Sequence, residues 1–488
     1  MKLACRLTKS RQTVRGAIKL LTSPVVRVAP FALLLISSVL LSAAPAREPQ
    51  PESSLKKAFR RPDQKGWIFV HLEGSPAEIG YQHGYLLTEE IVDTQRVVKA
   101  GLIHDSKKDY AFFRTAAETV LWPHVEEQYR EELKGIVTGL NAKGVNLDLW
   151  DVVVLNAWLE LSPYYVNYYD KARKVATAEH CSAFVATGKY TKDGKPVIAH
   201  NNWTEYKEGS RWNIMFDIVP AKGHRILMDG MAGLIHSGDD FGINDAGIAI
   251  TETTIGYFSH FDPQGIPEFV RARKAMQYSE SIDDFARIMK KGNNGGYANN
   301  WLLVDNRRNE IASLELGLKN VVLKRSNDGY FVGSNFPADP KLIREETDFP
   351  VADMGVSANA RHKRWETLMA ENKGNIDLAL AQKFLADHYD TFDNKEQPGE
   401  RTLCGHIDLS PRGSKPWEAE YAPAGAVQNK AADSTMIEHM ELSAAMGHSC
   451  GLDFHAKQHV QDHPEFGWEK DILRDLDSHQ WTQFEIAR

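Results

Sequence analysis

The strongest constraint on the fold is a change in hydrophobic periodicity at Cys181. Before this position, apolar residues recur three and four apart in two long stretches, Tyr81–Leu102 and 110–143, and this spacing predicts helices. From Cys181 onward, short apolar runs bounded by turn residues predict strands. Further helices are predicted between or after the strands, at about 267–290, 356–371 and 377–388. Runs of strands with helical covers indicate an α+β fold of sheets packed face to face.

The first two predicted strands form a hairpin. Cys181–Ala186 is a short apolar run, Thr191–Lys195 contains an Asp-Gly pair typical of a tight turn, and Pro196–His200 is apolar again. Later strands are predicted at Trp212–Val219, Gly247–Thr254, Trp301–Asp305, Ile311–Leu316 and Tyr330–Gly333.

Hairpin pairing places the residues that end the return strand across from Cys181. We expect His200 and Asn202 to act beside the thiol, because imidazole and amide groups can orient it or donate hydrogen bonds to a developing oxyanion. Asn201 and Trp203 are predicted to contact the substrate. A turn cluster beside a buried, inert cysteine is the alternative interpretation of the same residues.

A cysteine that opens a strand directly after a polar loop suits an N-terminal nucleophile. The loop ends with Ala176–His180, and we predict self-cleavage between His180 and Cys181. The cut leaves the thiol and a new α-amino group on one residue, and this amine, with an ordinary pKa of about 7.7–8.0, can act as the general base. The predicted organisation is a helical segment 47–180, cleaved but still associated, and a catalytic domain 181–488.

The first 46 residues have the layout of a secretory signal. A basic stretch without acidic residues precedes the apolar run Phe31–Leu41, and Ala44–Ala46 supplies a small-x-small cleavage site. The apolar run is short for a membrane span, and an uncleaved membrane anchor is the alternative. We therefore expect a secreted or periplasmic protein whose signal peptide is 1–46.

The cysteine count is informative for an exported protein. The chain has four cysteines, and Cys5 leaves with the signal. Cys404 and Cys450 are each followed by glycine, and we predict a disulfide between them, which leaves Cys181 as the reactive thiol. The histidines near the C-terminus lack a compact ligand spacing, so we expect no metal site and no cofactor. These histidines are His448, His455, His459 and His463.

Charge and short motifs exclude several other functions. The formal net charge is −7, and no basic stripe with interleaved aromatics is present, so nucleic acid is not an expected partner. The sequence has no Gly-x-Ser-x-Gly elbow of a serine hydrolase. Arg361 and Arg364 stand at helical spacing and could bind a carboxylate or phosphate head group, but such residues usually form a solvated helix face, which is what we expect.

Four motifs in register resemble the phospholipase B-like proteins. They are Cys181–Ala183, Ala199–Trp203, Ser237–Phe241 with Thr251–Ile255, and Asn299–Asp305. The opening Gly74–Pro76, with Gly80 and Gly84, is similar to the acyl-coenzyme A:6-aminopenicillanic acid acyltransferase family, peptidase family C45. The resemblance covers most of the chain, from about 70 to 435.

This resemblance implies an αββα N-terminal-nucleophile hydrolase fold with additional helices, an autocatalytic cut before Cys181, and cleavage or transfer of acyl groups. It places His200 beside the nucleophile and makes Asn299 or Asn300 the oxyanion or positioning amide. We count Asn300 among the catalytic candidates. The substrate-binding candidates that remain are Thr253, Thr254, Asn299 and Trp301. Related acylases often carry Arg or Asp where this chain has His200–Trp203, which favours the phospholipase B-like branch.

Three functions follow from these patterns. The first is hydrolysis or transfer at an amide bond of a small acylated substrate, through a Cys181 thioester. The second is phospholipase B-type ester hydrolysis of glycerophospholipids, with peripheral contact to a membrane. The third is a binding protein that keeps the fold without catalysis.

Overall fold

The computed structural model of the chain describes residues 51–171, 181–238, 241–414 and 418–487. All of them belong to the unit Pro49–Arg488, and the preceding unit is Met1–Glu48. The predicted signal 1–46 and His180, on one side of the predicted self-cleavage point, lie outside the described residues.

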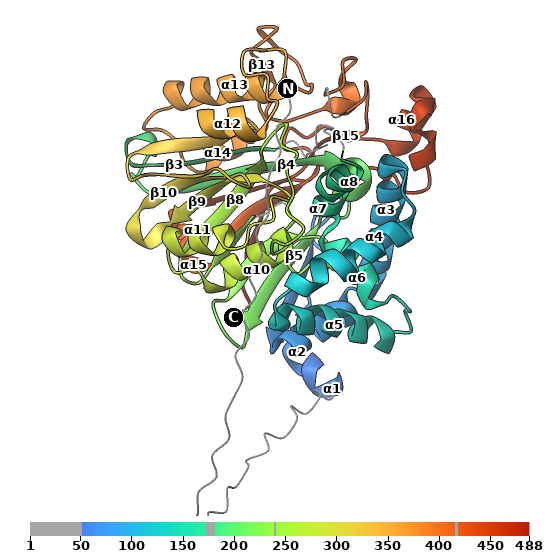
Figure 1. Cartoon of the computed structure of the whole chain (residues 1–488). Coiled ribbons are helices and arrows are strands. Elements are labelled where there is room, and N and C mark those ends of the chain that lie inside the picture. The colour runs from blue at the N-terminus through green and yellow to red at the C-terminus, as the bar shows by residue number, and fades with distance from the viewer. Residues whose placement is uncertain (1–50, 172–180, 239–240, 415–417, 488) are drawn as a thin grey trace, which may run out of the picture. The chain divides into compact units, whose positions relative to one another are not determined.

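Two large β-sheets form the centre of the fold (Figure 1). The nine-stranded sheet has the order β1-β2-β5-β6-β7-β8-β9-β10-β11, with β2 and β5 parallel and all other neighbours antiparallel. Its strands are β1 Phe59–Arg60, β2 Ile68–Gly74, β5 Ile214–Pro220, β6 Ile226–Gly230, β7 Gly242–Asn244, β8 Ile248–Thr254, β9 Asn299–Asp305, β10 Glu310–Leu316 and β11 Val321–Ser326.

The six-stranded sheet is antiparallel throughout and has the order β12-β3-β4-β15-β16-β17. Its strands are β12 Gly329–Gly333, β3 Ser182–Thr187, β4 Val197–Glu205, β15 Ala424–Asp433, β16 Glu441–Met446 and β17 Thr482–Glu485. A separate ribbon pairs β13 Tyr389–Asp390 with β14 Lys395–Glu396. The predicted hairpin is confirmed, since β3 and β4 pair directly.

The two sheets face each other across an apolar core. Val185 and Ile198 of the six-stranded sheet share one buried cluster with Ala249 and Leu302 of the nine-stranded sheet. Side chains alternate along a strand, so Phe184 and its neighbours of the same parity point to the opposite face and pack against helices. The predicted mixture of helices with packed sheets is therefore observed.

Helices cover both outer faces of the sheets. In Figure 1, α2 to α6 gather on one side, α12 to α14 lie above the strands, and α10 and α11 lie below them. The N-terminal helices are α1 Pro51–Ser54, α2 Pro76–Leu86, α3 Thr88–Ser106, α4 Tyr110–Ala116, α5 Glu127–Ala142, α6 Leu149–Asn156, α7 Trp158–Glu160 and α8 Val166–Asp170. The later helices are α9 Tyr206–Gly209, α10 Glu268–Tyr278, α11 Ile282–Lys290, α12 Pro340–Glu346, α13 Ser357–Glu371, α14 Leu378–Leu385, α15 Ser434–His439 and α16 Ala456–Asp462.

Two local features explain where one of these helices is divided and how closely two others pack. The single helix expected at 267–290 is divided into α10 and α11, because Ser281 caps the second helix by accepting a hydrogen bond from the Asp284 nitrogen. Helices α2 and α5 pack closely because Gly80 lies against the partner backbone. A Cβ there would stand 1.9 Å from the Glu132 carbonyl oxygen, so only glycine allows the approach.

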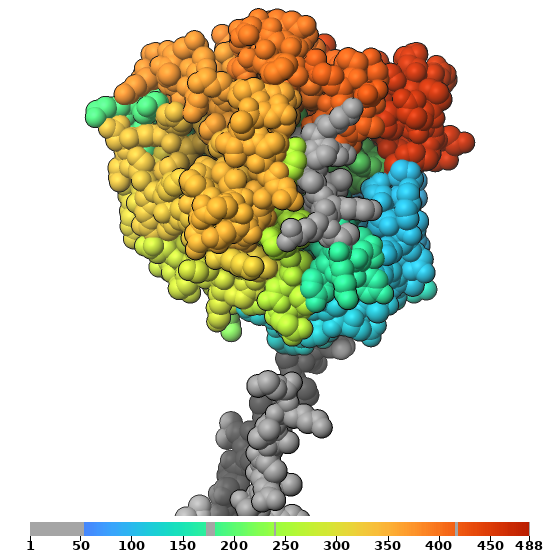
Figure 2. Space-filling model, turned by 45° about the horizontal axis from the view of Figure 1, so that its top comes forward, coloured from blue at the N-terminus to red at the C-terminus, as the bar shows by residue number. Residues whose placement is uncertain are grey.

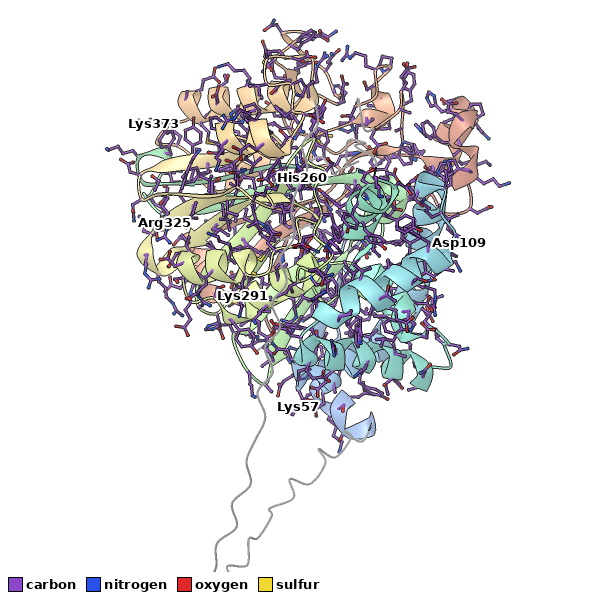
Figure 3. All side chains as sticks on the ribbon, in the orientation of Figure 1. Lys57, Asp109, His260, Lys291, Arg325 and Lys373 are labelled. Carbon is purple, nitrogen blue, oxygen red and sulfur yellow. The ribbon has the colours of Figure 1, made fainter. Side chains whose placement is uncertain are left out.

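Charged side chains lie at the surface of this fold. The labelled residues Lys57, Asp109, Lys291, Arg325 and Lys373 are all exposed and lie far apart (Figure 3). Within the described ranges, no helix combines the length and the apolar character that a bilayer span requires.

Candidate active site

Cys181 lies immediately before β3 and is completely buried. The β3–β4 register pairs Ser182 with Asn201 and Ala183 with His200, so that the thiol lies next to Asn202. The Cys181 thiol donates to Asn202 Oδ1 over 3.8 Å. The predicted proximity of Cys181 to the end of the return strand is therefore observed.

Two residues far away in the sequence hold the main chain of Cys181. Its nitrogen donates to Asn335 Oδ1 at 3.0 Å, and its carbonyl oxygen accepts from Arg361 Nη1 at 2.5 Å. Arg361 Nη2 also donates to Asn335 Oδ1 at 2.9 Å, and Asn335 Nδ2 donates to the Thr254 carbonyl oxygen at 3.0 Å. Asn335 thus connects the end of β8 in one sheet to Cys181 beside the other.

The position of Arg361 corrects the expectation of a solvated helix face. Its side chain, on α13, is entirely buried, and its guanidinium lies 4.5 Å from the centre of the Trp203 ring. Burial lowers the pKa of Arg361 to about 9, and the neighbouring Cys181 opposes this shift. Arg364, one turn along, forms a partly buried ion pair with Asp387 at 2.6 Å, so only Arg361 belongs to the site.

A histidine and a glutamate stand beside the thiol. One potential ligand atom from each of Cys181, His200 and Glu252 lies within 4.8 Å of the others, and all three residues are buried. Glu252, on β8, accepts a hydrogen bond from Tyr297 Oη at 3.0 Å. Such a group combines a nucleophile with two side chains that can move or hold a proton.

The two asparagines that open β9 differ in what they contact. Asn299, with its amide nitrogen turned to Glu252, donates to Glu252 Oε2 at 2.8 Å. Asn300 instead accepts a hydrogen bond from Ser313 Oγ of β10 at 2.7 Å. Of the two alternatives that the sequence left open, Asn299 is therefore the one connected to the group around the thiol.

Several buried polar atoms near Cys181 have no hydrogen-bond partner among the described residues. They include Asn202 Nδ2, Thr253 Oγ1 and Thr254 Oγ1. Burying such an atom without a partner costs about 1–3 kcal/mol, and such atoms cluster where a ligand can supply the partner. The amide of Asn202 is the one next to the thiol, since its Oδ1 contacts Sγ.

A buried ion pair lies beside His200, on the neighbouring strand β15. Lys430 of β15 pairs with His200 in register, and its Nζ lies 3.0 Å from Asp229 Oδ2, with both side chains fully buried. Gln428, opposite Asn202, donates to the same Asp229 oxygen at 3.1 Å. This network, which sequence patterns did not indicate, fixes the polar residues between the sheets.

Strand alternation directs three of the predicted substrate contacts elsewhere. Asn201 points away from the thiol and donates to the carbonyl oxygens of Leu385 and Leu403 at 2.7 and 2.9 Å. Trp301 packs against Phe285 in the core beneath α11. Trp203 also lies on the outer face of β4, where it stacks on Arg361. The prediction is corrected for Asn201 and Trp301, which support the structure and face away from Cys181.

Trp203 still reaches a cavity next to the site. This cavity of about 80 Å³ is open to solvent, and its lining residues include Trp203, Tyr297, Leu102 and Trp158. Its acidic lining residues are Asp105, Glu205, Glu208 and Glu418. In Figure 2 the red C-terminal segment borders the orange segment on one side and the blue N-terminal helices on the other. Tyr297 links the cavity to Glu252 and hence to the thiol.

Sequence reasoning missed two residues of the site, Asn335 and Glu252. Asn335 lies two residues after the end of β12 and has a φ of 63°, a conformation that asparagine tolerates better than most residues. A polar residue in that backbone conformation after a strand was the available signal. Glu252 is a carboxylate in the middle of a completely buried strand, which is rare without a functional or structural partner.

The predicted disulfide is absent. Cys404 and Cys450 are both free thiols, and they lie near His388 and His406. The two sulfurs lie within 4.8 Å of each other, and His406 Nε2 contacts both, so the thiols are close neighbours without a bond between them.

Several known proteins and one family model are similar to this chain. Residues 103–484 match the phospholipase B family model. The phospholipase B-like 1 protein of Caenorhabditis elegans is 22% identical over 484 residues, which cover 86% of this chain and 83% of that protein. The acyl-coenzyme A:6-aminopenicillanic-acid-acyltransferase 40 kDa form of Emericella nidulans is 27% identical over 49% of this chain and 60% of its own length. A conjugated bile acid hydrolase structure from Clostridium perfringens aligns with 63% of this chain at a TM-score of 0.32 and 10% identity, a weak likeness. Since the family model spans most of the chain, including all strands from β3 to β16 and the residues around Cys181, this protein belongs to the phospholipase B family.

Proposed function

We propose that this protein is a self-processed hydrolase or acyltransferase that cleaves an amide bond through a thioester on Cys181. The observation that carries the proposal is the hydrogen bond from the Cys181 nitrogen to Asn335 Oδ1 at 3.0 Å. After cleavage before Cys181, this nitrogen becomes an α-amino group that Asn335 already orients. The fold class that suits this chemistry is the αββα N-terminal-nucleophile sandwich, which the facing sheets with helices on both sides support.

The proposed reaction has two steps, acylation of Cys181 and release of the acyl group from it. The α-amine of Cys181 takes the thiol proton, and the sulfur attacks the acyl carbon of the substrate. The resulting oxyanion is stabilised by buried donors, for which Asn202 Nδ2 is the nearest candidate. Collapse breaks the C–N bond, the leaving amine takes the proton, and the acyl group stays on Cys181 as a thioester. Water or a second amine then attacks the thioester, and the thiol is regenerated.

His200 and Glu252 serve this reaction as positioning groups. Both lie within 4.8 Å of the thiol, and Tyr297 and Asn299 fix the Glu252 carboxylate. A carboxylate near a new α-ammonium group stabilises its charged form, which appears once the amine has taken the thiol proton.

The neighbouring cavity bears on the choice between amide and phospholipid substrates. Leu102 and Trp158 offer an apolar wall for an acyl chain. The described lining residues include four carboxylates and no Lys or Arg, which favours a substrate with a cationic or hydrogen-bond-donating group over an anionic phosphodiester. Burial raises the pKa of Glu418 to about 8, so this carboxyl is largely protonated at neutral pH and adds little negative charge. We therefore propose a small acylated amine as the substrate, acting in a secreted or periplasmic setting. Family membership keeps glycerophospholipid ester hydrolysis as the second candidate.

Self-processing is tested by intact-mass analysis and N-terminal sequencing of the purified protein. We expect fragments 47–180 and 181–488, of about 15 and 34 kDa at roughly 110 Da per residue, the larger beginning at Cys181. A fully active, uncut mature chain contradicts the proposal. A product screen with N-acyl amides and with lysophospholipids then separates the two enzymatic candidates. An uncut protein without turnover on either class supports the binding-protein alternative.

A further inference from the structure

We propose that His388, Cys404, His406 and Cys450 form a binding site for one structural zinc ion. The four residues come from three separate segments: the end of the loop after α14, the loop before the short helix Ile407–Leu409, and the turn after β16. One potential ligand atom from each lies within 4.8 Å of all the others. Two thiols and two imidazoles are a donor set typical of structural zinc.

The distances fit tetrahedral coordination. His406 Nε2 lies 3.5 Å from Cys404 Sγ and 3.4 Å from Cys450 Sγ. In a tetrahedral site with Zn–S of about 2.3 Å and Zn–N of about 2.0–2.1 Å, a sulfur and a nitrogen ligand stand about 3.5–3.6 Å apart. Both measured distances are within about 0.2 Å of this separation.

The surroundings favour a metal over other uses of the same groups. Cys404 and His406 are fully buried, and the two cysteines are free thiols. His388 Nε2 is buried without a hydrogen-bond partner among the described residues. An imidazole nitrogen left in that state is costly unless a ligand pairs with it.

Groups around the four ligands also resemble the outer surroundings of a zinc site. Asp408 Oδ1 stands 3.9 Å from His406 Nδ1 and is itself held by Tyr206 Oη at 2.7 Å. Ser449 Oγ donates to the Leu385 carbonyl oxygen at 2.7 Å and lies 3.7 Å from Cys404 Sγ. Polar groups beside the ligands are typical of the surroundings of a zinc site. With four protein ligands the coordination sphere is complete, which is the arrangement of structural zinc and not of a catalytic ion.

The cluster lies directly behind the strand that carries His200 and Asn202. Gly405, between two of the ligands, packs on the Trp203 ring so closely that a Cβ would stand 2.2 Å from it. The carbonyl oxygen of Leu403 accepts from Asn201 Nδ2 at 2.9 Å and from Trp203 Nε1 at 3.3 Å. A zinc ion would therefore fix the 403–406 loop against the outer face of β4. This inference does not depend on the proposed reaction.

Metal analysis of the full-length protein tests the site. Protein is produced with zinc and without added reductant. It is treated briefly with EDTA to remove loosely bound metal and is then desalted. Its zinc content is measured by inductively coupled plasma mass spectrometry. We expect about one zinc per chain in the wild type and at least a fivefold loss in Cys450→Ser. Cys181→Ser and His455→Ala, which change another thiol and an exposed histidine, should keep their zinc. X-ray absorption at the zinc edge should show two sulfur and two nitrogen neighbours.

Thermal unfolding provides a second readout. A strong zinc chelator should lower the melting temperature of the wild type and leave that of Cys450→Ser unchanged, because only the wild type has an ion to lose. Cys450 is half-buried, so its serine variant is the one expected to fold, and the wild-type measurement needs no variant. Zinc-free wild type with Cys404 bonded to Cys450, or zinc content that Cys450→Ser does not reduce, overturns the proposal.

Discussion

Arg361 and Asn335 meet at a single oxygen that also accepts from the Cys181 nitrogen. Arg361 Nη2 donates to Asn335 Oδ1 at 2.9 Å, and the Cys181 nitrogen donates to the same atom at 3.0 Å. Because Arg361 Nη1 reaches the carbonyl oxygen of Cys181, the two side chains bind both ends of this residue's main chain. The position of the sulfur is thereby fixed from outside the hairpin that carries it.

Asn335→Ala should reduce turnover about 10²–10³-fold, because the Cys181 nitrogen and Arg361 Nη2 both lose their acceptor. The positive φ of this position adds a stability cost of about 1–3 kcal/mol. Asn335→Asp keeps the Oδ1 acceptor and should retain more activity than the alanine variant. Steady-state kinetics with unfolding curves of both variants separates the two effects; equal activity in both would show that the shared oxygen is unimportant.

Arg361→Lys should impair both processing and turnover, since a lysine cannot reproduce the bonds to Cys181, Asn335, Ser182 and Ser357 at once. A control on the same helix is Lys363→Arg, where an exposed pair with Glu366 is worth about 0–1 kcal/mol. The measurement is the fraction of self-cleaved chain together with the rate of amide hydrolysis. Similar effects of the two substitutions would argue against a special role for Arg361.

Cys181→Ala should abolish turnover and self-cleavage, because an alanine methyl cannot attack an acyl carbon. Cys181→Ser should process slowly and retain little turnover, since an alcohol is not ionised at neutral pH. Circular dichroism confirms that each variant folds before its rate is measured. Wild-type rates in folded Cys181→Ala would mean that the chemistry lies elsewhere.

Asn299→Ala and Asn300→Ala form a matched pair of neighbouring amides. Asn299 contacts Glu252 and Asn300 contacts Ser313, so the first substitution should slow turnover about 10²-fold. The second should mainly cost stability, by about 1–3 kcal/mol, because it leaves the Ser313 hydroxyl without its acceptor. Parallel kinetics and denaturant unfolding make the comparison. The reverse ranking of activities would restore Asn300 as the catalytic amide.

Glu469→Gln should alter how stability depends on pH. Burial raises the pKa of Glu469 from 4.5 to about 7, although Lys207 opposes the shift. The folded state therefore holds a proton that the unfolded chain has already released, so the stability due to this proton is complete below about pH 4.5 and is lost as the pH rises through 7. Glutamine cannot ionise, and the melting temperature of the variant relative to the wild type should rise between pH 5 and pH 8. A constant difference across that range would contradict this assignment.

Local patterns in the sequence indicated the elements and placed Cys181 beside the end of the return strand. The change of periodicity at Cys181 predicted helices before it and strands after it, and the Asp-Gly turn predicted the β3–β4 hairpin. Because side chains alternate along a strand, the hairpin register also places His200 and Asn202 on the face that carries the thiol. The same alternation predicts that the Asn201 amide lies on the opposite face, and in the structure it does.

Only the tertiary structure decided which distant residues complete the site. Asn335 and Arg361 stand 154 and 180 residues from Cys181 in sequence, and no local period records their approach. Arg361 has the helical spacing of a solvated residue, yet packing of α13 against the six-stranded sheet buries it completely. The zinc ligands are likewise invisible as a motif, because loops held by backbone hydrogen bonds to Asp387 and Gly399 bring Cys404 and His406 to His388 and Cys450. Local propensity sets the direction of each side chain along its own element, whereas contacts between elements depend on how the sheets and helices pack.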